Sequence, residues 1–358
     1  MSQTSGQLRP TDIEPLPKRA LCIYEDRHSD IVGVKLLLLS IRRHAPSEHT
    51  LLFFPDAPQE VREFVEGLGS AVELREPPKE RLAGWNIKPG LMRHLLDEGW
   101  NEIVFIDSDI VLTGSLFRVM PPLPPETLGV TQEYRYALHN GGFFRVDAWG
   151  MERGNSHPTT LNTCVLRITE KHRELLERWE ELSGSSTFQQ AQAKPWNQRP
   201  LHMVGGQDVL TAMLGSAEWK HVPVHFGKRG SAIAQCFMED GYTTFERLAG
   251  LFQAKPAMVH AQGGKPWRPS ETDRLYVQLS PYAAAADAYA DELPEVRAWS
   301  RPRSKSARLC HAVALGHPAV RGVPLSLTRE LRRLVGFVLR TLKLKAPPPT
   351  VLAATRPA

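Results

Sequence analysis

The sequence predicts an α/β fold in which one mixed, mostly parallel sheet is flanked by helices. The first observation is alternation: a short apolar strand, a helix with a broad apolar face and a second apolar strand follow one another at residues 20–24, 31–44 and 50–54. This order predicts parallel strands joined by right-handed crossovers. The second observation is the apolar run at residues 103–106, whose β-branched and aromatic side chains are typical of a strand buried on both faces of a parallel sheet.

The other elements are expected to continue this alternation. In chain order, the pattern predicts a helix at 58–68, a strand at 71–74, a helix at 91–97, strands at 128–131 and 161–168, helices at 170–183 and 205–214, and strands at 222–224 and 257–259. The Gln-rich stretch at 187–201 is expected to be a polar, mobile connection.

Length and composition indicate a soluble protein with one large domain. The chain has 358 residues, of which 42% are hydrophobic and 23% charged, so it is able to bury a sizeable core. We assign residues 1–17 to a disordered or loosely docked arm because they are polar and contain proline. Residues 18–296 form the α/β domain, and residues 297–358 form a basic linker followed by an amphipathic helix.

The spacing of the cysteines and the absence of long apolar runs indicate the cellular compartment of the protein. The four cysteines lie far apart in the sequence, which excludes a zinc ribbon and fits a reducing compartment. The N-terminus lacks the apolar core of a signal peptide, and no apolar run approaches the ~20 residues of a spanning helix. We therefore expect a cytoplasmic protein without a nucleic-acid partner.

Basic charge is concentrated near the C-terminus. Residues 297–345 contain twelve Lys and Arg and one acidic residue, whereas the whole chain has a net charge of only +5. Within residues 326–345, apolar side chains at helical spacing form one stripe, made of Leu327, Leu331, Leu334, Val335, Val338 and Leu342. A basic amphipathic helix is typical of a peripheral anchor on an anionic membrane surface, here the inner face. The alternative is a helix that docks its stripe on the main domain.

Two aspartates directly follow the run at 103–106. Side chains alternate along a strand, so Asp107 and Asp109 are expected on one face and Ser108 on the other. Two buried carboxylates repel each other and are costly to desolvate, and a divalent cation relieves both problems. The carboxyl end of a strand is also where open α/β sheets bind ligands. From the triplet alone, a solvated turn that caps the next element is an equally good interpretation.

Later motifs extend this pattern. An Asn-bearing strand contains Asn162, a helix starts at Gln207-Asp208, and His260 precedes Lys265-Pro266-Trp267. In this order the motifs resemble glycosyltransferase family 8, the nucleotide-sugar-dependent retaining transferases of the GT-A fold that include glycogenin and bacterial lipopolysaccharide galactosyltransferases. The resemblance covers residues 20–267. It implies a GT-A domain that transfers a hexose from a nucleotide-sugar, with a UDP-sugar expected first, to a glycan or lipid-linked acceptor.

The resemblance also implies a metal and diphosphate site. Asp107, Asp109 and His260 would hold Mn²⁺ or Mg²⁺, which bridges the nucleotide diphosphate. Breaking a sugar–phosphate bond leaves extra negative charge on the diphosphate, and a divalent ion together with a lysine stabilises it. Lys265 is assigned to this role, because it follows a glycine pair, including Gly263, whose backbone can approach phosphates closely.

Further roles follow from the same resemblance. Lys88 corresponds to a basic residue over the diphosphate or the donor sugar, with a solvated lysine before a helix as the alternative. Tyr24 and His28 are both candidates for stacking on the nucleobase, and Ser108 is a candidate contact to the ribose.

On the sugar side, Asn162 and Gln207 match the family. Catalysis is assigned to Gln207, which would stabilise the oxocarbenium-like centre, together with Asp109. A strong second nucleophile is not apparent in the sequence, which suits an internal-return mechanism. Cys164 and Gly206 depart from the family, which has Gly and Asp at these positions.

Two other functions remain compatible with the sequence. Asp107-Ser108-Asp109, followed by Thr113, also fits the first motif of haloacid-dehalogenase-type phosphatases. That motif usually lies near an N-terminus, whereas several βα elements precede it here, which favours the transferase. The departures at Cys164 and Gly206 keep open a non-catalytic, nucleotide-sugar-binding relative.

Overall fold

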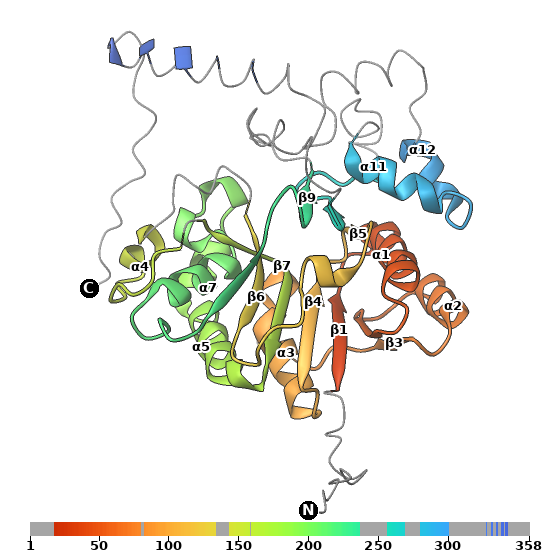
Figure 1. Ribbon diagram of the computed structural model, residues 1–358, viewed down its shortest axis with the longest axis horizontal. Helices are drawn as coiled ribbons and strands as arrows, with labels where there is room; N and C mark the ends of the chain where they lie inside the picture. The colour runs from red at the N-terminus through yellow and green to blue at the C-terminus, as the bar shows by residue number, and fades with distance from the viewer. Residues whose placement is uncertain are drawn as a thin grey trace, which may run out of the picture.

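The computed structural model describes residues 18–79, 82–133, 143–157, 159–236, 256–268 and 280–300, and eight residues between 327 and 342. At its centre is a seven-stranded sheet with the order β3-β2-β1-β4-β7-β6-β8 (Figure 1). Its strands are β1 (Arg19–Tyr24), β2 (His49–Phe53), β3 (Val72–Arg75), β4 (Glu102–Ile106), β6 (Leu128–Gln132), β7 (Leu161–Thr169) and β8 (Val224–Gly227). Only β7 runs antiparallel to its neighbours, β4 and β6, so the predicted mixed, mostly parallel sheet is confirmed.

Side-chain alternation along the central strands creates a core on each face of the sheet. In β1, Leu21 and Ile23 pack under α1 (Ile31–His44) and α2 (Gln59–Leu68). The intervening residues Ala20 and Cys22 face the opposite core. The helices that contribute to this second core are α3 (Lys88–Asp97), α5 (Arg173–Ser183), α6 (Ser186–Gln192) and α7 (Gly206–Gly215). The predicted layer of helices on each side of the sheet is therefore present.

A smaller sheet lies beyond the carboxyl ends of the central strands (Figure 1). It has the order β5-β10-β9, with β5 at Ile110–Leu112, β10 at Met258–His260 and β9 at Ile233–Gln235. α11 (Pro281–Ala286) and α12 (Arg297–Ser300) cover it through a third apolar cluster that includes Tyr282 and Trp299. α4 (Phe144–Ala148) packs near α7.

The structure differs from the predicted elements in several places. The strand expected at 222–224 lies at Val224–Gly227 as β8, and β9 at Ile233–Gln235 was not predicted. Asp107 and Asp109, expected to continue the alternation of the strand, instead lie in a turn: β4 ends at Ile106, and residues 107–109 connect it to β5, which belongs to the other sheet. The stretch at 187–201, expected to be an irregular connection, contains most of α6 and a 3₁₀ turn at Trp196–Gln198. Ser185 caps α6 by accepting a hydrogen bond from Phe188 N, and Phe188 is buried in the core, which explains why this Gln-rich segment is ordered.

The structure describes only part of the two terminal segments for which predictions were made. The arm at 1–17 and the basic linker at 301–326 lie outside the described residues. Within the part of the chain that is described, none of the helices is both long and apolar enough to traverse a membrane. The six apolar residues of the tail stripe have 43–61% of their surface exposed.

Candidate active site

The Asp107–Asp109 turn lies at the junction of the two sheets, at the carboxyl end of β4. Asp107 N donates to Cys164 O (2.8 Å), and Ile110 N donates to Asp107 O (3.2 Å). These bonds attach the turn to β7 and close it on itself. Both carboxylates reach one cavity, although turn geometry, and not strand alternation, brings them there.

His260 meets these carboxylates through long-range strand pairing. β10 pairs antiparallel with β5, which places His260 opposite Ile110, the residue after Asp109. Its Nε2 lies 3.1 Å from Asp109 Oδ1. One ligand atom from each of Asp107, Asp109 and His260 lies within 4.8 Å of the other two.

The chemistry of these three side chains fits a divalent cation. Carboxylate oxygens suit Mn²⁺ and Mg²⁺, whereas an imidazole nitrogen is typically a ligand of transition metals, so the mixed set fits Mn²⁺ better than Mg²⁺. His260 is 4% exposed, and its Nδ1 has no hydrogen-bond partner among the described residues. The sequence-predicted ligand set is thus assembled in space.

Two buried lysines face the same carboxylates. Lys88, in the first turn of α3, places Nζ 2.6 Å from Asp107 Oδ1 and 2.9 Å from Thr163 O. Lys265 forms an ion pair with Asp109 Oδ2 and donates to Ala261 O (2.7 Å). Both lysines are at most 6% exposed, which excludes a solvated role for Lys88.

The electrostatics of Asp109 follow from this arrangement. Burial raises the pKa of its carboxyl group, but Lys265 and His260 together outweigh burial and hold that pKa well below its ordinary value. Burial by itself would lower the pKa of His260. The nearby Asp109 carboxylate outweighs burial, and the pKa of His260 is well above its ordinary value. Asp109 is therefore a carboxylate across the physiological range.

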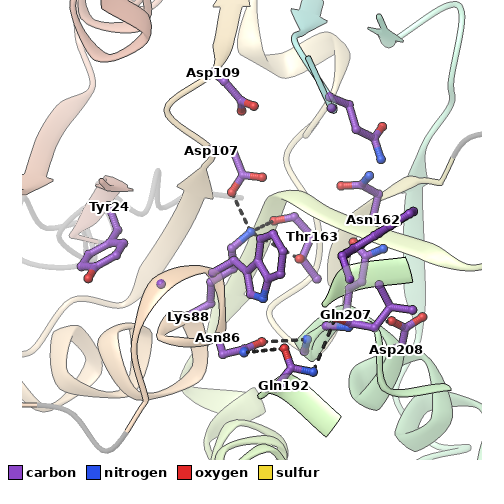
Figure 2. Close-up of a pocket in the computed structure, with 18 of the residues that line it drawn as sticks. Tyr24, Asn86, Lys88, Asp107, Asp109, Asn162, Thr163, Gln192, Gln207 and Asp208 are labelled. Atoms are coloured by element: carbon purple, nitrogen blue, oxygen red, sulfur yellow. Dashed lines mark hydrogen bonds and ion pairs between the residues drawn. The ribbon is translucent and has the colours of Figure 1, made fainter. Parts of the chain in front are cut away.

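All of these groups line one cavity of about 840 Å³. The predicted site residues that it brings together are Tyr24, Lys88, Asp107, Ser108, Asp109, Asn162, Gln207, His260, Gly263 and Lys265. Figure 2 shows Tyr24 on one side of Asp107 and Lys88, with Asn162 and Gln207 on the other. His28 does not line the cavity; it packs edge-on against Phe54, with ring centroids 5.7 Å apart.

Two of the predicted contacts have particular local environments. The Ser108 hydroxyl is 3% exposed and donates to Glu25 Oε2 (2.5 Å), so its hydrogen is already engaged. Gly263 has φ +93°, a conformation that L side chains rarely adopt, so glycine is required in the loop between His260 and Lys265.

A central residue that the sequence analysis missed is Glu133. It is 4% exposed and accepts hydrogen bonds from three side-chain amides, one in β7, one in α7 and one in the loop after β10. Asn162 Nδ2 and Gln207 Nε2 donate to Oε2 at 3.0 and 2.8 Å, and Gln262 Nε2 donates to Oε1 at 2.8 Å. Its signal was a carboxylate directly after a buried strand, since β6 ends at Gln132.

The structure shows what surrounds the two residues that depart from the family. A Cβ at Gly206 would lie 3.1 Å from Asn86 Oδ1 and 3.4 Å from Trp179 Nε1, so Asn86 occupies the space that a larger residue at position 206 would need. Cys164 is buried, with Sγ 3.2 Å from Thr131 Oγ1, and its backbone N donates to Asn162 Oδ1 (2.8 Å). Cys164 N therefore helps to orient the Asn162 amide.

Comparison with known proteins yields resemblances to solved structures alone. No family model matches the chain, and no curated protein matches it. The galactosyltransferase LgtC, in complex with donor and acceptor sugar analogs, is 16% identical over 75% of this chain and 95% of its own, with a TM-score of 0.49. The apo bifunctional glycosyltransferase WbbM is 16% identical (TM-score 0.47, 84% of this chain), and the chain spans 54% of its length. Mouse xyloside xylosyltransferase 1 is 15% identical over 70% of this chain and 99% of its own (TM-score 0.44).

These identities and TM-scores are low. The α/β arrangement is established by the sheet topology itself, and the chemistry of the site rests on the residues that line the cavity.

Proposed function

We propose that this protein is a glycosyltransferase that moves a hexose from a nucleotide-sugar, a UDP-sugar in the first instance, to a glycan or lipid-linked acceptor with retention. One observation carries the proposal: Asp107, Asp109 and His260 converge with Lys88 and Lys265 in a single cavity at the carboxyl end of β4. This combination of a cation site with two fixed positive charges suits a nucleoside diphosphate leaving group.

The two lysines would act on the departing diphosphate. A divalent cation held by the two aspartates and the histidine would supply Lewis-acid stabilisation of its negative charge. Lys88 and Lys265 are buried and held by backbone carbonyls, so their charges are oriented before the substrate arrives and need little reorganisation. Tyr24, which lines the cavity where His28 does not, is the proposed contact to the nucleobase.

Gln207 and Glu133 would act on the sugar. Because Gln207 Nε2 donates to Glu133, the amide oxygen of Gln207 is the atom left to face a carbon that becomes positively charged. Three amide donors occupy most of the roughly four lone-pair sites of the Glu133 carboxylate, which lowers its nucleophilicity. That favours internal return, in which the leaving phosphate removes the proton of the acceptor hydroxyl, over a covalent intermediate on Glu133.

The charge state of Asp109 opposes the phosphatase alternative. In that chemistry the second aspartate has to donate a proton to the leaving group. Asp109 has a depressed pKa and is paired with both Lys265 and His260, so it is poorly suited to carry a proton. The transferase is therefore the better fit.

The tail stripe supports a peripheral anchor on an anionic membrane. Its apolar residues are exposed in the described helix, and the surrounding sequence is strongly basic. Apolar area and basic charge are the two signals that stable membrane attachment generally needs. Such an anchor would bring the cavity close to a lipid-linked acceptor.

The test of the proposed function is a panel of UDP- and GDP-sugars with Mn²⁺, in which donor hydrolysis and UDP affinity are both measured. We expect Mn²⁺-dependent UDP binding and slow hydrolysis of a UDP-sugar, with both lost in Asp109→Ala while the melting curve stays cooperative. Mn²⁺-dependent UDP affinity that survives Asp109→Ala would contradict the proposal. UDP binding without hydrolysis or transfer from any donor would identify the non-catalytic relative instead.

A further inference from the structure

Two exposed tryptophans stand at the same cavity. In the described residues between 18 and 300, three large apolar side chains are exposed: Trp85 (55%), Phe117 (49%) and Trp196 (52%). Both tryptophans line the cavity, and Phe117 does not. Single exposed apolar residues need no explanation, but two indoles at one cavity mark a surface that is suited to an apolar partner.

Trp85 is held in place by Arg199. The guanidinium carbon lies 5.6 Å from the centroid of the indole ring, within reach of a cation–π interaction. Arg199 is itself fixed by hydrogen bonds to Gln192 Oε1 (2.7 Å) and Gln192 O (3.0 Å), and to the backbone carbonyls of Val204 (3.0 Å) and Lys194 (3.0 Å). The Trp85 indole is therefore positioned before a ligand arrives, which reduces the entropy that binding has to overcome.

Trp85 borders the residues assigned to sugar transfer. A Cβ on Gly205 would lie 3.8 Å from Trp85 Nε1, and Gly205 precedes α7, in which Gln207 is the second residue. Asn86, next to Trp85 in the chain, accepts a hydrogen bond from Gly206 N (2.9 Å). In Figure 2, Asn86 and Gln192 lie on the far side of Lys88 from Asp109. Trp85 is thus close to the start of α7.

We propose that Trp85 and Trp196 form the acceptor subsite of the enzyme, and that the group they bind is a hexopyranose ring of the acceptor glycan. This inference rests on the proposed function, which assigns Tyr24, the cation ligands and the two lysines to the nucleotide. In a β-linked glucose or galactose, the C–H bonds at C1, C3 and C5 are axial and share one ring face. That apolar face packs on an indole, whereas the hydroxyl groups project from the ring edge, and in galactose O4 from the opposite face, toward polar side chains and water.

The experiment uses the full chain saturated with UDP and Mn²⁺, with methyl β-D-galactopyranoside and methyl β-D-glucopyranoside as probes. Saturation-transfer NMR would report which glycoside protons contact the protein. The NMR saturation-transfer signal should be strongest at H1, H3 and H5 of at least one glycoside. Trp85→Ala and Trp196→Ala should each weaken glycoside binding roughly five- to tenfold. Phe117→Ala removes an aromatic ring of similar exposure outside the cavity and should change nothing.

The outcomes separate this inference from the proposed function. Calorimetry with UDP and Mn²⁺ should give equal affinities for the wild type and both tryptophan variants. Lower UDP affinity in the variants would mean that the indoles bind the nucleotide, and it would overturn the acceptor assignment. Glycoside binding that is unchanged in the double variant, or absent from the UDP-saturated wild type, would overturn it as well. Failure of the wild type to bind UDP would instead refute the proposed function.

The same ring could belong to a soluble glycan or to a lipid-linked one. Transfer to the preferred methyl glycoside is therefore compared with transfer to the same sugar on a lipid anchor in phosphatidylglycerol vesicles. Trp85→Ala should lower both rates, because the indole contacts the ring in either case. A rate with the lipid-anchored sugar that is insensitive to both tryptophans would overturn the subsite.

Discussion

Glu133 offers the sharpest test of how the site is built. Three amide groups converge on its carboxylate, and each donates a hydrogen bond of 2.8–3.0 Å. Glu133→Ala leaves these three donors without their acceptor. At roughly 1 kcal/mol or more for each unsatisfied donor, we expect a loss of about 3 kcal/mol in the free energy of unfolding.

Glu133→Gln should behave quite differently. The carbonyl oxygen of the new amide can take the place of Oε2 and accept from Asn162 and Gln207. Its NH₂ group then faces Gln262, whose own Oε1 is buried and has no hydrogen-bond partner among the described residues, so a flip of the Gln262 amide restores the third bond. What remains lost is the negative charge of the acceptor, and we expect this to lower the free energy of unfolding by about 1–2 kcal/mol in total.

The kinetic consequences follow from the orientation of Gln207. In Glu133→Ala its amide is free to rotate, so kcat for donor hydrolysis should fall about 10- to 100-fold while the affinity for UDP is retained. Glu133→Gln keeps the orientation and should stay within several-fold of the wild-type kcat. Chemical denaturation, UDP calorimetry and single-turnover hydrolysis measure the three quantities. A Glu133→Gln variant as inactive as Glu133→Ala, yet stably folded, would refute the reasoning, because the carboxylate charge itself would then be required.

Four further predictions address other parts of the molecule. Lys265→Ala should weaken donor affinity and turnover together, whereas Gln207→Ala should mainly lower turnover; full turnover with collapsed UDP affinity in Gln207→Ala would reverse the assigned roles. Gly206→Asp should displace Asn86 and reduce the melting temperature, with Gly67→Asp, whose Cβ meets nothing within 4 Å, as the matched control. Burial lowers the pKa of His172 to about 4, below its usual 6.5, so the unfolded chain takes up this proton first. As the pH falls from 6.5 to 4, the free energy of unfolding should therefore decrease by up to about 1.4 kcal/mol per pH unit. In His172→Gln this pH dependence should disappear, and an unchanged pH dependence would contradict the burial argument. Deletion of residues 318–358 should abolish flotation with anionic vesicles and spare donor hydrolysis, while a lowered melting temperature in a protein that never floated would support the docked helix.

The sequence by itself determined the elements whose signals are local. The alternation of Leu21 and Ile23 with Ala20 and Cys22, followed by a helix with an apolar face, was sufficient for the parallel β1–α1–β2 unit. The Asp107–Asp109 pair was recognisable because its carboxylates directly follow an apolar run. Hydrophobic periodicity is a property of neighbouring residues, so no knowledge of the rest of the chain was needed.

Only the tertiary structure decided how distant segments meet. The pairing of β10 with β5 brings His260 to Asp109, and the break after Ile106 makes the Asp107–Asp109 segment a turn between two sheets. Likewise, Glu133 gains its importance from three amides on other elements, and His28 lies against Phe54 and not in the cavity. Trp85 and Trp196 share a cavity although 110 positions separate them in the sequence. Such contacts depend on packing and strand register between segments far apart in the chain, which no local pattern encodes.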